Sequence, residues 1–244
     1  MFDTARVSNP SPGTVVAPAT TLAERRDHLL PTASALQPLF PEHALRRGST
    51  VGVAGTGATS LAFALLAAPT ATGAWCAAVG LDSLGMQVAD AAGIPLARFA
   101  LVPDPGTDWP AIVAALLDAF EVVLLRPPVR AGATAQRRLT ARVRERRRAL
   151  VVLAPDAPAT GWSFDVHLTG TTGVWEGLGW GAGHLRSRQL EIRAGGRRLA
   201  GGTRHASVWL PDTEGHVTAV RPAAPPTPLR RVDSADAGTS AGVA

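Results

Sequence analysis

The segment VGVAGTGATSLAFALLAA (residues 51–68) has residue types and a spacing that could bind phosphate. Gly52 and Gly57 fall on the glycines of the pattern G-x-x-x-x-G-K-[ST], and Thr59 falls on its hydroxyl position. In a working loop, backbone N–H groups and the helix N-terminus hold the phosphates, a lysine neutralises them, and the hydroxyl binds magnesium. Ala58 stands at the lysine position, so the charge that this chemistry needs is missing.

The second position that this chemistry needs is an acid at the end of another strand, which orients the metal. Here the strand-like segment VVLL is followed by Arg126, so a cation stands where a carboxylate is required. All 24 basic residues are arginine, so no lysine from elsewhere can replace the one missing at position 58. The degenerate Walker A and Walker B positions predict that the protein is not an enzyme, with no catalytic residue and no bound cofactor.

Three interpretations of the glycine loop stay open. Gly52, Gly55 and Gly57 allow close backbone approach, so the amides alone could bind nucleotide weakly, as in a residual ATPase. The same glycines resemble the dinucleotide fingerprint G-x-G-x-x-G, with Asp82 as the ribose-binding acid of an oxidoreductase, although Ser60 replaces the third glycine. The third interpretation is a tight strand-to-helix turn that binds nothing.

Strand and helix patterns alternate over the first two thirds of the chain. Strands are expected at 49–53, 74–79, 99–102, 121–125 and 149–153, and helices at 58–68, 82–92, 108–120 and 134–148. This alternation favours a parallel sheet flanked by helices. Segments 164–169, 185–193 and 205–210 alternate apolar and polar residues, which is typical of antiparallel strands. The predicted fold class is therefore α/β, a parallel sheet extended by C-terminal antiparallel strands.

The composition predicts one domain between two arms. Residues 1–27 are expected to form a flexible N-terminal arm, 28–220 the domain, and the proline-bearing 221–244 a disordered tail. The N-terminus lacks the apolar core of a signal peptide, and the longest wholly apolar run, 61–68, is far shorter than the roughly 20 residues of a membrane span. One cysteine and scattered histidines predict neither a disulfide nor a metal site. We expect a cytoplasmic protein without membrane contact.

Positive charge is concentrated in one segment. Residues 126–148 hold nine arginines and one acid, whereas the whole chain has a net charge of +5. The arginines of the expected helix are Arg137, Arg138, Arg142, Arg144, Arg146, Arg147 and Arg148. Leu139 and Val143 leave only a narrow apolar stripe for docking on the sheet. The helix is either a solvated face or a contact surface for DNA phosphate or an acidic partner, so a DNA-binding module using residues 137–148 is an alternative function.

Two tryptophans are candidate anchors for a protein partner. Trp175 and Trp180 lie in the segment VWEGLGWGAG, which its glycines predict to be mobile. An exposed tryptophan in such a segment is typical of a binding hot spot.

The ordered set of segments resembles a known family. ALRRGSTVGVAG (residues 44–55) is similar to the lead-in of RecA-like domains. Together with GAWCAAVG, DWPAIVAALLDAFEVVLLRPP, RRLTARVRERRRALVVL and WGAGHLRSRQLEI, it resembles the actinobacterial ImuA-type branch over residues 28–220.

The resemblance implies a RecA-like accessory or scaffold protein of the SOS response to DNA damage that is not a recombinase. Its implied role is mutagenic translesion synthesis beside an ImuB-like, polymerase-related partner and, indirectly, an error-prone DnaE-type polymerase. DNA and RecA are further candidate partners, and the implied location is the cytoplasm, at the nucleoid after damage. Loss of the nucleotide-handling residues in this branch agrees with Ala58 and Arg126.

Overall fold

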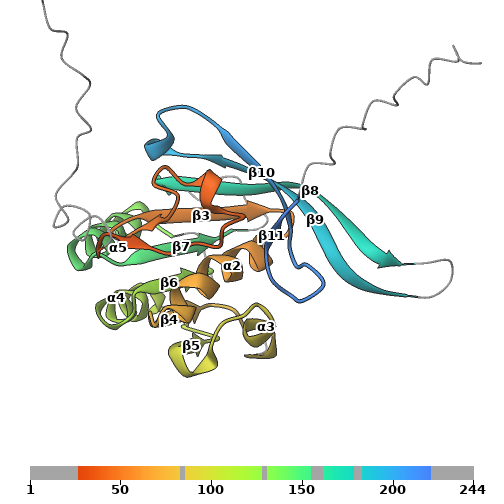
Figure 1. Cartoon of the computed structure of the whole chain (residues 1–244). Coiled ribbons are helices and arrows are strands. Elements are labelled where there is room, and N and C mark those ends of the chain that lie inside the picture. The colour runs from red at the N-terminus through yellow and green to blue at the C-terminus, as the bar shows by residue number, and fades with distance from the viewer. Residues whose placement is uncertain (1–26, 83–85, 128–130, 155–161, 179–182, 221–244) are drawn as a thin grey trace, which may run out of the picture.

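The computed structural model describes residues 27–82, 86–127, 131–154, 162–178 and 183–220. The predicted tail and nearly all of the predicted N-terminal arm lie outside these residues, as does Trp180. A nine-stranded sheet forms the centre of the molecule, and a two-stranded sheet of β1 (Leu29–Leu30) and β2 (Leu45–Arg46) lies beside it (Figure 1). No helix within the described ranges combines the length and the apolar character that a membrane crossing would need.

The order of the large sheet is β11-β10-β9-β8-β3-β7-β6-β4-β5. Its parallel strands are β3 (Thr50–Gly55), β4 (Cys76–Val79), β5 (Phe99–Val102), β6 (Val122–Leu125), β7 (Ala149–Leu153) and β8 (Val166–Leu178). The antiparallel strands are β9 (Gly183–Gly195), β10 (Arg204–Trp209) and β11 (Thr218–Ala219). The predicted α/β class, a parallel sheet with an antiparallel C-terminal extension, is confirmed.

The prediction was incomplete for the first strand of the C-terminal part. The segment expected at 164–169 was assigned to the antiparallel strands, and β8 does pair antiparallel with β9. On its other side β8 pairs in parallel with β3, with Val51 opposite Val166. Alternation along a strand reports which faces are buried and says nothing about the direction of its neighbour.

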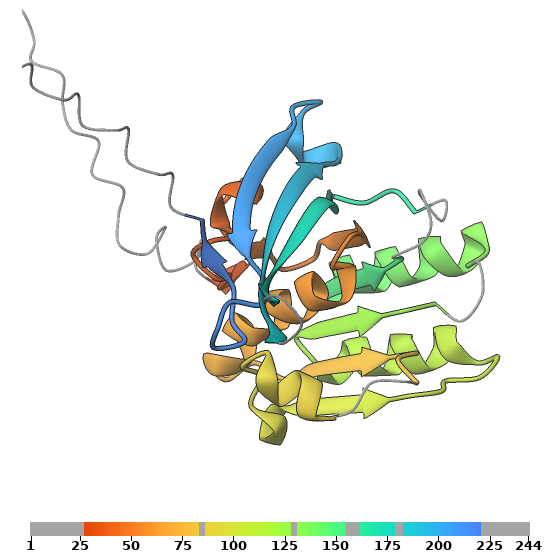
Figure 2. The same ribbon diagram turned by 90° about the vertical axis from the view of Figure 1, so that its right-hand side faces the viewer.

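Helices cover both faces of the sheet (Figure 2). The helices are α2 (Ala58–Ala71), α3 (Met86–Ala91), α4 (Trp109–Ala119) and α5 (Ala133–Arg146), with short 3-10 helices η1 (Gln37–Leu39), η2 (Leu96–Arg98) and η3 (Arg197–Leu199). The core divides accordingly into two clusters, one containing α2 residues and one containing α4 and α5 residues. Consecutive strand residues point to opposite faces. Val151 therefore belongs to the first cluster, and Val152 to the second.

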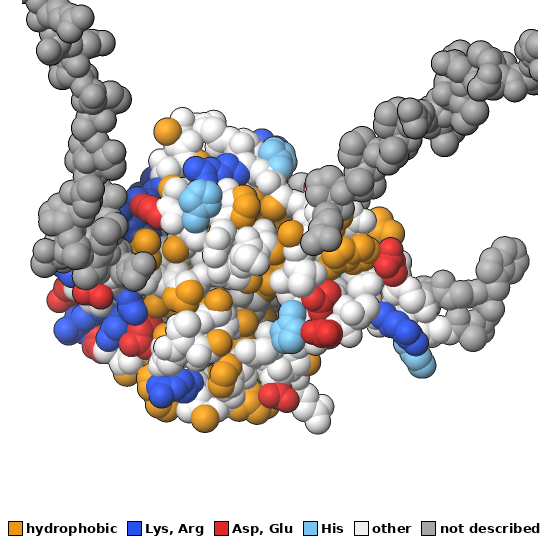
Figure 3. Space-filling view, in the orientation of Figure 1, with side chains coloured by type: hydrophobic (Ala, Val, Ile, Leu, Met, Phe, Trp, Pro, Cys, Tyr) orange, Lys and Arg blue, Asp and Glu red, His pale blue; other side chains and the backbone are white. Residues whose placement is uncertain are grey.

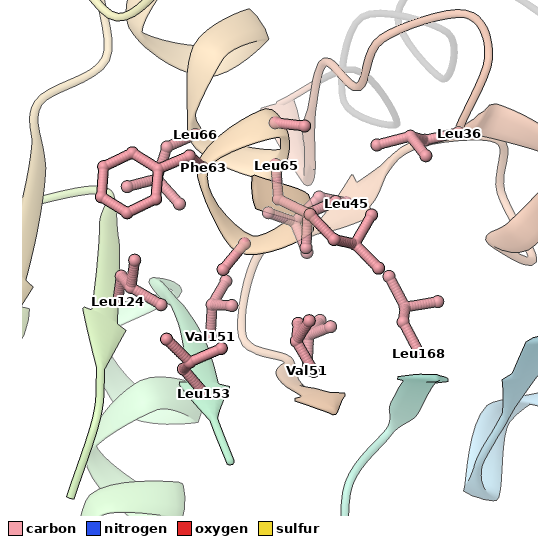
Figure 4. Close-up of a cluster of buried hydrophobic side chains, with 14 of the residues drawn as sticks. Leu36, Leu45, Val51, Phe63, Leu65, Leu66, Leu124, Val151, Leu153 and Leu168 are labelled. Carbon is pink, nitrogen blue, oxygen red and sulfur yellow. The ribbon is translucent and has the colours of Figure 1, made fainter. Parts of the chain in front are cut away.

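The close-up in Figure 4 shows how α2 is held on the sheet. Phe63, Leu65 and Leu66 project from the helix toward Val51 and Val151, and all five side chains are buried. This packing positions the glycine-rich turn between β3 and α2. On the opposite face, Leu139 and Val143 of α5 are buried as the sequence predicted.

Strands β8 and β9 form a ribbon that projects from the sheet (Figure 1). Only residues 166–170 of β8 pair with β3, and only residues 189–194 of β9 pair with β10. Beyond these residues the two strands pair with each other, and Trp175 lies opposite Arg188. The described part of the glycine-rich segment at Trp175 therefore lies in a strand, because it pairs with β9 despite its glycines.

Candidate functional site

The glycine-rich turn lies at the carboxyl end of β3, the usual end for a ligand site in a parallel sheet. Gly55 and Gly57 have φ values of 76° and 69°, and Gly57 is the N-cap of α2. These left-handed conformations favour glycine and shape the turn. Gly52, however, lies within β3. A Cβ there would come within 2.5 Å of the Phe164 ring, so this glycine serves packing and is not part of the turn.

Strand β8 braces the turn from one side. The N–H of Thr56 donates a 2.9 Å hydrogen bond to the carbonyl of Gly170, so this amide already has a partner. A Cβ at Gly55 would collide with the same carbonyl. One of the amides that would be available to a phosphate in an open nest is therefore used to hold the turn against the sheet.

Arg188 of β9 brings a positive charge to the turn. A Cβ at Gly57 would lie 2.5 Å from its Nη2 and 2.8 Å from its Cζ, so the guanidinium packs directly on the glycine. Arg188 is only 8% exposed, and burial lowers the pKa of its guanidinium. Its Nε donates a 2.9 Å hydrogen bond to the Leu210 carbonyl, and Trp175 stacks on it at 5.0 Å. Nη2 has no hydrogen-bond partner among the described residues.

The sequence excluded a substitute lysine anywhere in the chain, but it gave no indication that an arginine from a distant segment lies at the turn. Arg188 reaches the turn through the pairing of β9 with β8 and of β8 with β3. Its segment, LRSRQLE (residues 185–191), is polar on both sides of Arg188 and carries no local sign of a phosphate loop.

The residues at the start of α2 do not form an open phosphate site. Ala58 is 2% exposed and packs in the core. Thr59 lines a neighbouring cavity of about 340 Å³ together with apolar residues such as Phe63 and Leu210. A hydroxyl at the edge of an apolar cavity, without an acid beside it among the lining residues, is a poor magnesium ligand.

Arg126 lies at the same end of the sheet but away from the turn. It follows β6, and β7 lies between β6 and β3. Two strand spacings place the backbone of β6 about 10 Å from that of β3. Arg126 instead lines a separate polar hollow with Gly80, Asp82 and Asp104. The turn therefore receives no acid from β6, and Arg126 itself lines a different hollow.

The arginines of α5 divide into paired and unpaired groups. Arg142 pairs with Asp118 at 2.6 Å and with Glu145 at 3.5 Å, and Arg146 pairs with Asp118 at 3.0 Å. Arg148 lies 3.7 Å from Glu121. Figure 3 shows arginine and acidic side chains intermixed over the end of the molecule where α4 and α5 lie. Arg142, Arg146 and Arg148 therefore link α5 to its neighbours and are not free for a ligand.

Four other arginines predicted as contacts make no ion pair within the described ranges: Arg137, Arg138, Arg144 and Arg147. The helix ends at Arg146, two residues earlier than predicted. Arg147 takes a left-handed C-cap conformation with φ of 51°, which turns the chain toward β7.

The predicted partner anchor Trp175 is 42% exposed on the projecting ribbon. Val174 and Leu185 of the same ribbon are also exposed large apolar residues. The sequence did not single out Trp75, which is 45% exposed before β4 and stacks on Arg98 at 5.5 Å. Exposure alone therefore does not distinguish the two tryptophans, and only Trp175 lies on an element that projects from the sheet.

Two other side chains with reactive groups, Cys76 and His167, pack against their neighbours. Cys76 is fully buried, and burial, with a smaller contribution from Glu121, raises the pKa of its thiol to about 12. Burial lowers the pKa of His167, which stacks on Phe164. Within the described residues, no three His, Cys, Asp or Glu side chains lie close enough to hold a metal.

The fold and this turn together define an α/β domain with a phosphate-loop-like turn that lacks its lysine and its metal-binding acid. The chain belongs to the family described as the MT3502 N-terminal domain, whose model matches residues 38–159. It is similar to the uncharacterised protein Rv3395c of Mycobacterium tuberculosis, with 36% identity over 129 residues, 53% of this chain and 54% of the relative. The chain thus matches about half of the length of this curated relative.

Proposed function

We propose that this protein is a non-catalytic, RecA-like accessory factor of damage-induced mutagenic translesion synthesis. It acts by binding an ImuB-like, polymerase-related protein and, through it, an error-prone DnaE-type polymerase. The resemblance of residues 28–220 to the ImuA-type branch supports the biological role. The mycobacterial relative is uncharacterised and adds no function.

The observation that carries the non-catalytic part is the position of Arg188 on Gly57. The guanidinium packs against Gly57, a glycine of the phosphate-loop pattern, and Trp175 stacks on it. Ala58 offers no charge, and no acid from β6 stands near the turn. A turn filled by its own side chain and without a metal site is suited to hold β9 in place, and unsuited to phosphoryl transfer.

Titration of the full chain with ATP and magnesium tests this part. We expect no turnover and no change in melting temperature at concentrations that saturate ordinary ATPases. NADH is the second titrant, because the dinucleotide alternative shares the same turn. Micromolar ATP binding that is lost in Arg188→Ala would mean that Arg188 replaces the missing lysine, and it would overturn the proposal. Tight NADH binding would favour the oxidoreductase.

Partner capture and genetics test the biological part. We expect the protein to co-purify with the ImuB-like protein of its own organism, and deletion to abolish damage-induced mutagenesis. An unchanged mutation frequency in the deletion strain would contradict the role while leaving the nucleotide result untouched.

A further inference from the structure

A basic hollow of about 390 Å³ lies at the amino ends of β3, β7 and β8. We define the basic hollow by its charged lining residues Arg46, Arg47, Arg144, Arg147, Arg198 and Asp165. The remaining lining residues are His28, Gly48 and Ser49, so no aliphatic side chain and no phenylalanine, tyrosine or tryptophan faces it. The glycine-rich turn lies at the opposite end of β3, a strand of six residues and therefore about 20 Å away.

The arginines of the basic hollow come from three separate segments. The N–H of Gly48 donates a 2.7 Å hydrogen bond to the carbonyl of Arg148, and Gly48 has a φ of 78°. The turn that follows β2 is thereby fixed on the end of α5. This contact brings Arg47 beside Arg144 and Arg147, and η3 adds Arg198 from beyond β9.

The two carboxylates near the basic hollow are already engaged. Glu42 pairs with Arg46 at 3.3 Å and with Arg198 at 2.6 Å. Asp165 accepts a 2.9 Å hydrogen bond from the Thr50 N–H and pairs with Arg197 at 3.0 Å.

Three guanidinium groups of the basic hollow have no such partner. Arg47, Arg144 and Arg147 make no ion pair with any residue of the described ranges. The excess of positive charge is therefore local and uncompensated.

Helix stability explains only part of this arrangement. Arginines in the last turn interact favourably with the negative end of a helix, which accounts for Arg144 and Arg147. It does not account for Arg47, which comes from another segment and adds like charge to the same place. Like charges held together without a counterion cost free energy, and a bound anion would relieve this cost.

We infer that the basic hollow binds the phosphodiester backbone of a nucleic acid without regard to base sequence. Guanidinium groups match phosphate oxygens in charge and in bidentate geometry. The lining has no apolar anchor for a protein partner. Its one ring is the His28 imidazole beside five arginines, so the contact that it offers is chiefly to phosphate. The sequence predicted a DNA contact along residues 137–148. The inferred contact keeps only the C-terminal end of that segment and adds Arg47, which comes from another part of the chain.

The test measures fluorescence anisotropy of labelled single- and double-stranded DNA of mixed sequence with the full chain. The hollow variant is Arg47→Gln with Arg144→Gln. The charge-matched control is Arg137→Gln with Arg138→Gln, two exposed arginines at the other end of α5. At about 50 mM salt we expect the hollow variant to bind about tenfold more weakly or worse, and the control to bind within about threefold of the wild type.

The salt dependence gives a second readout. Between about 50 and 200 mM salt, the slope of log K against log salt should become shallower by about 2 in the hollow variant. Equal losses in both variants, no DNA binding by the wild type, or preference for a polyglutamate chain over DNA would each overturn the inference. Circular dichroism melts check that both variants fold. The assay contains only this chain and DNA, so its result is independent of the ImuB-like partner.

Discussion

Nη2 of Arg188 lies 2.5 Å from the position that a Cβ at Gly57 would occupy. This contact joins the start of α2 to the middle of β9. The ribbon of β8 and β9 and the glycine-rich turn therefore form one packed unit. A substitution at Gly57 should therefore disturb the packing of β9, and a substitution at Arg188 should disturb the turn.

The first prediction concerns this contact. Gly57→Ala should destabilise the fold by about 2–3 kcal/mol, because a residue with φ of 69° costs about 1–2 kcal/mol and the guanidinium must also move. Gly106→Ala is the matched control, since Gly106 has φ of 58° and open space around its Cβ position. Chemical denaturation of both variants measures the difference.

The double variant separates the cost of the left-handed backbone at position 57 from the cost of the contact with Arg188. In an Arg188→Ala background, the cost of Gly57→Ala should fall toward that of Gly106→Ala, with a coupling of about 1 kcal/mol. Additive effects of the two substitutions would show that the contact carries no energy.

The second prediction concerns the projecting ribbon. Trp175→Ala should weaken binding of the ImuB-like partner by about 2 kcal/mol or more, because an exposed tryptophan on a projecting element is a typical hot spot. Trp75→Ala is the matched control. Trp75 has nearly the same exposed fraction and also stacks on an arginine, but it precedes β4, far from the ribbon in the strand order. Pull-down or calorimetry compares the two, and equal losses would argue against the ribbon as the docking element.

The third prediction concerns alkaline stability. The thiol of Cys76 has a pKa of about 12 in the fold, against 9.0 for an ordinary thiol, because it is buried. Above pH 9 the unfolded chain releases this proton and the folded chain keeps it, so stability falls as pH rises. The loss should approach about 1.4 kcal/mol per pH unit up to the folded pKa.

Cys76→Ala tests this assignment. The variant should lose less stability than the wild type between pH 8 and pH 10 in urea titrations. Parallel loss in the two proteins would mean that other groups dominate the alkaline response.

The fourth prediction concerns the link between α4 and α5. The hydrogen bond from Arg142 holds the pKa of the Asp118 carboxyl below its usual range, although the Asp118 side chain is exposed. In Arg142→Gln, NMR titration should show the Asp118 carboxyl returning toward an ordinary value. In Arg138→Gln, which removes the same charge from the same helix, it should stay low. An unchanged Asp118 in Arg142→Gln would place Arg142 elsewhere in solution and return it to the candidate nucleic-acid contacts.

Local patterns predicted the elements well where burial is uniform. The run ALVVL is apolar throughout and forms β7 over the predicted residues 149–153. The pair Leu139 and Val143 docks α5 as expected from its spacing. Glycine was a poorer guide, since Gly52 was assigned to the phosphate turn and lies within β3, packed under Phe164. The sequence alone does not distinguish a glycine that makes room for a neighbouring side chain from a glycine that a turn requires.

The amino-acid sequence by itself determined which residues stand at the two charged positions of the phosphate-loop pattern: Ala58 in place of the lysine and Arg126, after VVLL, in place of the acid. Its alternating patterns also determined the class of fold. Only the tertiary structure decided that Arg188 packs on Gly57 and that Arg47 meets Arg144. Both arrangements join residues far apart in the chain. Their distances depend on strand order, register and the docking of a helix end, none of which a local pattern of residue types encodes.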